Sequence, residues 1–296
     1  MTNSTQVSTA RLNGKIALVT GAGRGIGRGV AVELGSRGAS VVVNYASSTA
    51  SANEVVEVIE KLGSKAIAVQ ADVSNVDEIS KLFKETIDHF GRVDIVVSNS
   101  GTESFDKTED ITPEKFDDVF GLNARGQFFV GQHAYKNLSR GGRLVLMSSI
   151  ASGVIGVHDH ALYAGSKCAV EGFTRSFATD FGHKGITVNC IAPGGIKSDM
   201  FASVAWRYIP GGDKSWSADR IEAAMASHCP LQRCAVPVDV ARVVAFLVSE
   251  DGGWVNGMCF AHMIVFLTLI WSRSNHHNIR RLVPVASLSI VTVKAG

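Results

Sequence analysis

The sequence lacks the features that mark a secreted, fibrous or membrane-spanning protein. It has 5 cysteines and 6 prolines among 296 residues, and the cysteines include no Cys-x-x-Cys pair. An odd cysteine count without regular spacing favours reduced thiols over a disulfide framework, so we expect a cytoplasmic protein. The longest apolar stretch, residues 258–271, is shorter than the ~20 residues that a spanning helix needs, so we predict no stable membrane span.

The sequence also has almost no excess of charge of either sign, because 29 basic and 27 acidic side chains leave a formal net charge of +2. This balance provides no electrostatic basis for binding nucleic acid. His158, His160, His276 and His277 lack the partners of a metal site, so we predict solvated or locally bonded histidines and no metal. Hydrophobic residues make up 46% of the chain, which indicates a globular protein rather than a disordered or collagen-like one.

Short apolar runs rich in β-branched residues alternate with helical patterns between Lys15 and Pro193. The runs are continuous rather than alternating, as in strands that are buried on both faces of a parallel sheet. They cover residues 16–20, 41–43, 66–69, 95–98, 143–147 and 187–191. Between two of them, Val55, Ile59 and Leu62 mark one face of a helix. The pattern predicts one α/β domain of Rossmann type, with a doubly wound parallel sheet flanked by helices.

A glycine-rich loop, residues 20–27 with the sequence TGAGRGIG, follows the first predicted strand and precedes a helical pattern. Glycines allow the backbone to turn tightly and to approach a pyrophosphate, which the free N–H groups of the helix N-terminus then bind. A plain glycine turn is the alternative interpretation. The position between first strand and first helix is the one that dinucleotide binding requires, so we predict a dinucleotide site.

The end of the second predicted strand distinguishes the two nicotinamide cofactors. An NAD site usually has Asp or Glu there, but residues 44–48 read NYASS and the next acid is Glu54. Arg24 in the glycine loop could pair with a 2′-phosphate, although an arginine that is merely solvated would look the same in the sequence. The sequence therefore favours NADPH/NADP⁺.

Tyr163 and Lys167 stand four residues apart in a helical pattern, so both side chains project from one face. A free tyrosine titrates near ~10. A neighbouring ammonium stabilises the phenolate, so we expect Lys167 to lower the pKa of Tyr163. A Tyr-x-x-x-Lys pattern alone is common in helices. Ser149, at the end of a predicted strand, and Asn123, in another helical segment, make a catalytic set more specific.

These motifs together resemble the short-chain dehydrogenase/reductase family over about residues 11–257. The finer resemblance is to its fungal polyketide branch, the tetra- and trihydroxynaphthalene reductases of melanin synthesis and versicolorin-type anthraquinone reductases. The family resemblance rests on residues 20–27, Asp72, Asn99-Ser100-Gly101, Asn123, Ser149, Tyr163-x-x-x-Lys167 and residues 193–196. The finer one rests on residues 98–105 (SNSGTESF), 125–129, 193–200, 208–210 and 251–257.

The resemblance implies roles for five side chains. Tyr163 would be the general acid that protonates the substrate oxygen, and Lys167 would lower its pKa and hold the nicotinamide ribose. Ser149 would hydrogen-bond the substrate oxygen, and Asn123 would hold a water that links Lys167 to solvent. Tyr208 would stack on an aromatic substrate. It lies in a segment that also contains Phe201, Trp206 and Trp216, for which ordinary packing is the alternative.

The resemblance also implies a cofactor site, a substrate class and an assembly. Asp72 would bind the adenine edge, Asn99 the adenosine ribose region, and Ile196 with Ser198 the carboxamide side. The substrate would be a small aromatic polyketide of secondary metabolism, and the protein would be a homo-oligomer, either a dimer or a tetramer. The full cofactor-binding set is Gly21, Arg24, Gly25, Ile26, Gly27, Asn44, Tyr45, Asp72, Asn99, Gly101, Tyr163, Lys167, Pro193, Gly194, Ile196 and Ser198.

The two ends of the chain depart from this pattern. We expect residues 1–10 to be a disordered leader, residues 11–257 to be the NADP-binding reductase domain, and residues 258–296 to be an atypical tail. The family normally continues after Gly257 with a short strand, whereas this tail, a gene-model artefact or a genuine alternative terminus, resembles nothing in the family. Residues 265–269 have the composition to replace that strand.

Three functions are compatible with the sequence. The leading one is NADPH-dependent reduction of a keto, quinone or hydroxyaromatic group of a polyketide. A 3-oxoacyl carrier-protein or hydroxysteroid reductase would share the four catalytic residues but have different pocket walls. A cofactor-binding protein made inactive by its altered C-terminus would have no need for all four residues.

Overall fold

The structure is a computed structural model that describes residues 11–153, 155–199 and 201–262. Within these residues seven strands form one sheet, and every neighbouring pair in it is parallel. The order is β3-β2-β1-β4-β5-β6-β7, so the doubly wound parallel sheet is confirmed. The strands are β1 (Ile16–Val19), β2 (Ser40–Tyr45), β3 (Ala66–Gln70), β4 (Val93–Ser98), β5 (Leu138–Met147), β6 (Thr187–Pro193) and β7 (Cys259–His262).

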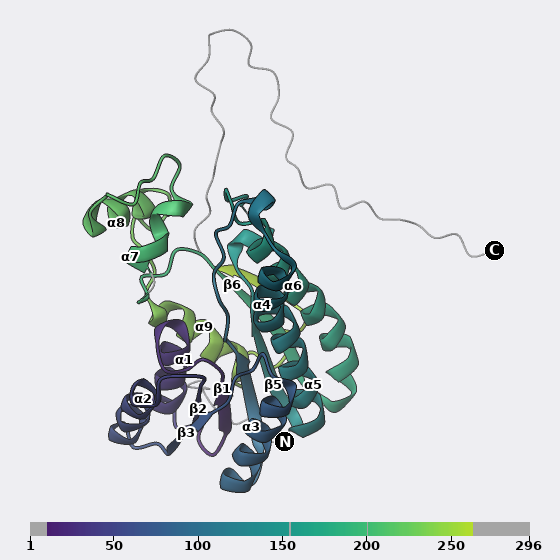
Figure 1. Cartoon of the computed structure of the whole chain (residues 1–296). Coiled ribbons are helices and arrows are strands. Elements are labelled where there is room, and N and C mark those ends of the chain that lie inside the picture. Colours follow the sequence, from purple (N-terminus) through teal and green to yellow (C-terminus); the bar gives the residue numbers. More distant parts are fainter. Residues whose placement is uncertain (1–10, 154, 200, 263–296) are drawn as a thin grey trace, which may run out of the picture. The chain divides into compact units, whose positions relative to one another are not determined.

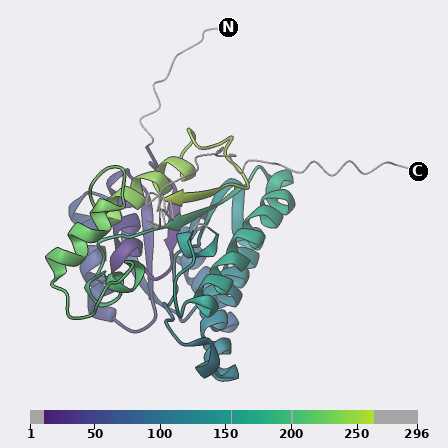
Figure 2. The ribbon, with the colours of Figure 1, turned by 90° about the horizontal axis from the view of Figure 1, so that it is seen from above.

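Helices cover both faces of the sheet (Figures 1 and 2). On one face lie α1 (Gly25–Ser36), α2 (Thr49–Lys61) and α9 (Pro237–Val248). On the other lie α3 (Val76–Phe90), α5 (Gln127–Asn137) and α6 (Ala161–Phe181). The helix α4 (Pro113–Phe120) leads into α5 through a π-helical segment, η2 (Gly121–Gly126).

The strands are apolar on both faces because each face has its own core. In β1, Ala17 and Val19 pack with the α1, α2 and α9 side, while Leu18 packs with the α3, α5 and α6 side. The same alternation in β4 places Ile95 on the first side and Val96 on the second. Two-sided burial explains why the runs are continuous in the sequence.

Local signals fix where the helices begin and end. The side chain of Ser48 accepts a hydrogen bond from Ser51 N at the start of α2, and Asn75 does the same for Asp77 N at α3. Gly91 ends α3 with a left-handed φ of +82°. Leu62 was expected on one helix face with Val55 and Ile59, but it is the C-cap residue of α2 and is 51% exposed, whereas Val55 and Ile59 are buried.

The seventh strand lies in the segment that the sequence interpretation assigned to the tail. β7 pairs with β6 in the register Cys190↔Cys259, beginning two residues after Gly257. Residues just before it are fixed by two asparagines, because Asn256 Oδ1 accepts from Val188 N at 2.8 Å and Asn189 Oδ1 accepts from Met258 N at 3.1 Å. A strand that pairs through its backbone needs few specific side chains, so the foreign sequence still completes the sheet edge. Residues 265–269, like residues 1–10, lie outside the described residues.

A separate helical segment lies between β6 and α9. It contains α7 (Phe201–Val204), η5 (Ala205–Tyr208) and α8 (Ala218–Ser227), and we call it the lid. It has a small core of its own that includes Phe201, Ala205, Ile221 and Met225.

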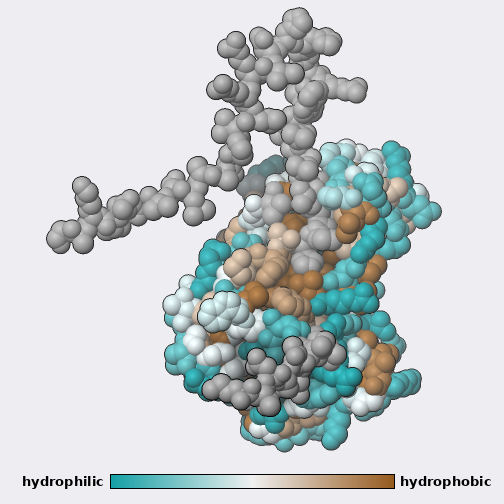
Figure 3. All heavy atoms as spheres, turned by 180° about the vertical axis from the view of Figure 1, so that it is seen from behind, coloured by the Kyte–Doolittle hydropathy of each residue, from teal (hydrophilic) through white to brown (hydrophobic). Residues whose placement is uncertain are grey.

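Apolar side chains gather in the middle of one surface of the molecule (Figure 3). Exposed large apolar residues include Phe246, Trp254 and Met258, which belong to α9 and the turn before β7. None of the helices in the described ranges is long and apolar enough to cross a membrane.

Candidate active site

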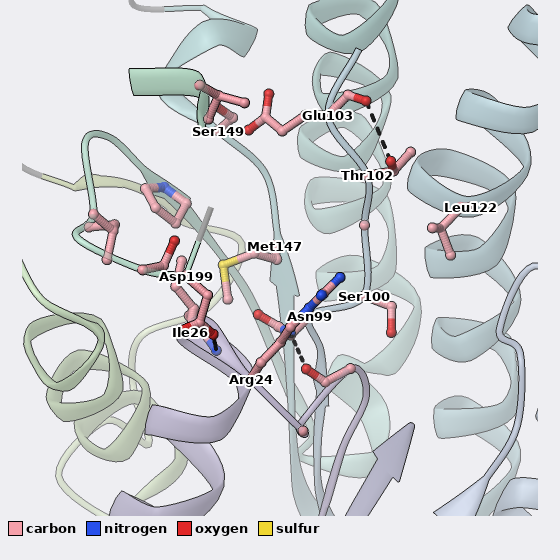
Figure 4. Close-up of a pocket in the computed structure, with 18 of the residues that line it drawn as sticks. Arg24, Ile26, Asn99, Ser100, Thr102, Glu103, Leu122, Met147, Ser149 and Asp199 are labelled. Carbon is pink, nitrogen blue, oxygen red and sulfur yellow. Dashed lines mark hydrogen bonds between the residues drawn. The ribbon is translucent and has the colours of Figure 1, made fainter. Parts of the chain in front are cut away.

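A cavity of about 590 Å³ lies at the carboxyl ends of the parallel strands. Loops that follow β1 to β6 line it, among them those with Arg24, Asn99 and Ser149 (Figure 4). The lid contributes Phe201, Ala205 and Tyr208. The chain reverses its direction of winding between β1 and β4, which are neighbours in the sheet. Ligands of open α/β sheets bind in the crevice at such a point.

The glycine loop forms one end of the cavity. Gly21 and Gly25 have left-handed φ angles of +60° and +56°. A Cβ atom on Gly27 would lie 2.2 Å from the main-chain oxygen of Gly21, so the loop can close only with glycine there. The N–H of Gly25 donates to Oδ2 of Asp199 at 3.0 Å (Figure 4), so this helix N-terminus binds a carboxylate in the structure. These features fit the pyrophosphate of a dinucleotide.

Most of the predicted cofactor residues line this cavity. They are Gly21, Arg24, Gly25, Ile26, Tyr45, Asp72, Asn99, Gly101, Tyr163, Lys167, Pro193, Ile196 and Ser198. Among the lining residues that the structure gives, Gly27, Asn44 and Gly194 do not occur.

Asn44 departs from its predicted role because its side chain is buried beneath the glycine loop. Its Oδ1 accepts from Gly21 N at 3.2 Å, and its Nδ2 donates to the main-chain oxygens of Val69 and Ala71 at 3.2 and 3.0 Å. All of these partners are main-chain groups. Asn44 therefore fixes the loop by joining the ends of β2 and β3 to it.

Lys167, a residue of α6, is buried, and its Nζ donates to the main-chain oxygen of Met147 at the end of β5, at 3.0 Å. Gln127 fixes Met147 as well: it donates to the same oxygen at 2.8 Å and accepts from Met147 N at 2.9 Å. A Cβ atom on Gly101 would lie 3.1 Å from Lys167 Nζ, so the absence of a side chain there leaves room for the ammonium. Burial lowers the pKa of Lys167 to about 8.

Asn123 lies in the π-helical segment and does not reach the cavity. Its Oδ1 accepts from Thr102 N at 2.8 Å, and its Nδ2 donates to Thr102 O at 2.9 Å and to Ser166 Oγ at 3.1 Å. Ser166 in turn donates to the main-chain oxygen of Tyr163 at 2.7 Å. Asn123 thus connects the loop after β4 with helix α6. A π-bulge that turns one side chain inward is common at functional sites.

The electrostatics around Tyr163 contradict the expectation from its spacing to Lys167. Burial raises the pKa of Tyr163, the charge of Glu103 raises it further, and a hydrogen bond with Ser149 acts in the opposite direction. Lys167 Nζ lies 5.7 Å from the centroid of the tyrosine ring and donates to Met147. The spacing brings the two side chains together but does not set the pKa, because a carboxylate that the sequence interpretation did not consider faces the same hydroxyl.

Glu103 is the residue that sequence reasoning missed. It lines the cavity, its side chain is 24% exposed, and its Oε2 lies 2.9 Å from the Tyr208 hydroxyl and 3.6 Å from His160 Nε2. Burial raises the pKa of its carboxyl group, against the opposing effects of Tyr208, Lys167 and Tyr163. A signal was available, because an acid in the loop after a central parallel strand is directed toward the ligand crevice.

His160 connects the lid to the start of α6, the helix that carries Tyr163 and Lys167. Its Nε2 lies 3.0 Å from the Tyr208 hydroxyl, and its Nδ1 lies 2.7 Å from the main-chain oxygen of Ser104. Its ring stacks on Tyr163, with centroids 4.4 Å apart, and on Phe105 at 4.2 Å. Burial lowers its pKa to about 4. The described ranges contain no group of His, Cys, Asp and Glu side chains that could hold a metal ion.

Comparisons with known proteins agree with this geometry. Residues 21–262 match the family described as enoyl-(acyl carrier protein) reductase. The chain is 59% identical over 254 residues to the hydroxynaphthalene reductase-like protein Arp2 of Metarhizium acridum, which covers 86% of this chain and 95% of that protein. It is 54% identical over 244 residues to the tetrahydroxynaphthalene reductase PfmaG of Pestalotiopsis fici, and this match covers 82% of this chain and 88% of that protein. The solved structure of a short-chain dehydrogenase from Burkholderia cenocepacia in complex with NADP matches this one with a TM-score of 0.76 and 34% sequence identity. The match covers 85% of this chain and 97% of that one.

Proposed function

The chain belongs to the short-chain dehydrogenase/reductase family, and we propose that it reduces a keto, quinone or hydroxyaromatic group of an aromatic polyketide with NADPH. It is an oxidoreductase of small molecules that uses a nicotinamide cofactor. One observation carries the proposal: a single cavity joins the glycine loop to Ser149, Tyr163 and Lys167. Cofactor and substrate can therefore meet at the group that donates the proton.

The substrate class is supported by the relatives and by the cavity wall. Relatives above 50% identity are named hydroxynaphthalene or tetrahydroxynaphthalene reductases. Phe201 and Tyr208 of the lid line the same cavity as Ser149, Tyr163 and Lys167. A flat phenolic ligand fits an aromatic lining of this kind through stacking. We place the reaction in the biosynthesis of a secondary metabolite.

Two features favour NADPH over NADH. Arg24 is exposed where it lines the cavity, and its guanidinium can pair with a 2′-phosphate. Tyr45 and the serines that follow it line the same side of the cavity and include no acid to accept from a ribose 2′-hydroxyl. Asp72 also lines the cavity, and we assign it to the adenine.

The residues of this chain would act on the proton. When bound, NADPH supplies the hydride. Tyr163 gives its proton to the substrate oxygen, and Ser149 donates a hydrogen bond to the same oxygen. The raised pKa of Tyr163 keeps the proton on its hydroxyl until substrate arrives. Lys167 would hold the nicotinamide ribose and stabilise the phenolate that remains. Asn123, whose side chain does not line the cavity, would hold a water that returns a proton through Lys167.

A panel of substrates tests the proposal. The purified protein is incubated with NADPH or NADH and with hydroxynaphthalenes, anthraquinones and 3-oxoacyl thioesters, and the loss of NAD(P)H absorbance is followed. We expect turnover of the aromatic compounds with NADPH and at least ~10-fold lower kcat/KM for the thioesters, which lack a planar face for Tyr208. Preferential reduction of the thioesters would favour a 3-oxoacyl carrier-protein reductase. No turnover of any compound would favour an inactive cofactor-binding variant.

A further inference from the structure

Three titratable side chains from different segments meet at the lid side of the cavity. Glu103 comes from the loop after β4, Tyr208 from η5, and His160 from the residue that precedes α6. The Tyr208 hydroxyl lies between the other two, 2.9 Å from Glu103 Oε2 and 3.0 Å from His160 Nε2.

The hydrogen atoms available to this cluster can be counted. His160 Nδ1 lies 2.7 Å from the main-chain oxygen of Ser104, which can only accept, so Nδ1 must carry a hydrogen. The ring is 1% exposed, and burial together with Arg207 favours its neutral form. Nε2 is then an acceptor. Tyr208 has one hydroxyl proton and two acceptors facing it if Glu103 is ionised, so one of its two short contacts would bring lone pairs together.

One additional proton completes a chain of hydrogen bonds through these residues. With a protonated carboxyl group, Glu103 donates to Tyr208 Oη, Tyr208 donates to His160 Nε2, and His160 Nδ1 donates to Ser104 O. The same proton on His160 would give a buried imidazolium beside Arg207 and a buried carboxylate, which costs more than the neutral pair. Glu103 is therefore the site of the proton.

We propose that Glu103 is a positioning residue whose protonated carboxyl group donates to Tyr208 and holds η5 of the lid against His160 and the start of α6. Loss of the proton reverses the Glu103–Tyr208 bond, because the carboxylate then accepts from the Tyr208 hydroxyl. The hydroxyl no longer donates to His160 Nε2, and the lid can move away from the start of α6. The effect on substrate rests on the proposed function, because Tyr208 is the side chain that would stack on an aromatic ligand.

The groups that face Glu103 determine when it releases its proton. Tyr208 and Arg207 lie in η5, Tyr163 and Lys167 in α6, and His160 directly before it. Hydrogen bonds from Tyr208 and Tyr163 and the charge of Lys167 lower the pKa of Glu103, but burial outweighs them, so its pKa is above the ordinary value of 4.5. Because an ionised Glu103 also raises the pKa of Tyr163, the proton that closes the lid makes the general acid stronger.

Two substitutions separate this role from simple packing. Glu103→Gln keeps the shape and can donate an N–H to Tyr208 at every pH, as the protonated carboxyl group does. Glu103→Leu can donate nothing. Hydrogen exchange of the amides of η5 and of Ile209, which follows η5 and donates its N–H to Trp206 O, reports lid closure without any need for catalysis. Amides of α9 serve as the internal control, and exchange rates are divided by the intrinsic rate at each pH.

We expect the wild-type protein to lose ~10-fold of its η5 protection between about pH 5 and about pH 9. The Gln variant should show no such loss. The Leu variant keeps only the Tyr208–His160 bond, so it should be less protected than the Gln variant and equally so at both pH values. With a hydroxynaphthalene substrate, the wild-type KM should rise over the same range, and Glu103→Gln should abolish that rise. Equal pH responses in wild type and the Gln variant, or a pH-dependent loss of protection in the Leu variant, would overturn the proposal. A pH-dependent lid in a protein that reduces no aromatic substrate would support the proposal and refute the proposed function.

Discussion

The side-chain amide of Asn123 hydrogen-bonds both main-chain groups of Thr102, accepting from its N–H at 2.8 Å and donating to its oxygen at 2.9 Å. Glu103 is the next residue along the chain. The residue predicted to act through a water thus also fixes the loop that carries the missed carboxylate. A third bond, to Ser166 Oγ, fixes the same amide to α6.

Asn123→Ala should therefore destabilise the protein as well as slow it. Both main-chain groups of Thr102 lose their partner, and an unpaired polar group costs about 1–3 kcal/mol when buried. We expect a lower midpoint in urea denaturation and a fall in kcat. Ser166→Ala is the matched control because it removes only one of the three bonds of the Asn123 side chain. An unchanged midpoint in Asn123→Ala would contradict the structural role.

Arg24→Ala should weaken NADPH much more than NADH. Only NADPH presents a 2′-phosphate, and a charge-assisted hydrogen bond of about 1.5–3 kcal/mol corresponds to ~10–100-fold in Kd. Titration of protein fluorescence with each cofactor measures both constants. Arg28→Ala, which changes an exposed arginine on α1 away from the cavity lining, is the control. Equal weakening of both cofactors would mean that Arg24 is structural and that the preference arises elsewhere.

The pH profile should report Lys167. Burial lowers its pKa to about 8, so the ammonium that stabilises the phenolate is present below that pH and is lost as the pH rises through it. In the Glu103→Gln background, which removes the pH-dependent KM expected from Glu103, we predict that kcat/KM, which reports the free enzyme, falls above about pH 8. Lys167→Arg in the same background remains charged and should lack this falling limb, whatever its absolute rate. A Glu103→Gln profile that is flat to about pH 10 would contradict the assignment.

Assembly should occur through α5 and α6. Phe128 and Phe173 are only partly buried, and their rings lie 5.3 Å apart on the faces of these helices. We predict a dimer through this pair of helices, with larger species heterogeneous because residues after Gly257 differ from the family. Light scattering compares the full chain with a chain that ends at His262, which keeps β7. A uniform tetramer of both chains would show that the tail does not affect assembly.

The sequence was sufficient to predict the fold, and it singled out Ser149, Tyr163 and Lys167, which line one cavity, for physical reasons that can be named. Strands buried on both faces leave continuous apolar runs, and a tight turn such as that at Gly27 admits only glycine. β7 could not be predicted because an edge strand pairs through its backbone, and the side-chain hydrogen bonds of Asn189 and Asn256 hold the residues that lead into it. The pKa of Tyr163 was predicted in the wrong direction because spacing in a helix reveals Lys167 but not the burial of the hydroxyl, which raises the pKa most, nor the Glu103 carboxylate from another loop.

Asn44 shows the same limit at the cofactor site. Its position at the end of the second strand is the place where a ribose contact is expected, yet its side chain faces the protein and binds three main-chain groups. Strand alternation fixes which face a side chain occupies, but the partners it finds there depend on the neighbouring strand.

The measurement that tests the account most directly is the comparison of turnover and cofactor affinity in Tyr163→Phe. The substitution removes the hydroxyl that protonates the substrate but leaves Lys167 and the glycine loop in place. We predict a fall in kcat of at least ~10²-fold with a Kd for NADPH within about 3-fold of the wild type. Turnover comparable to the wild type would contradict the assignment of Tyr163 as the general acid, and with it the proposed mechanism.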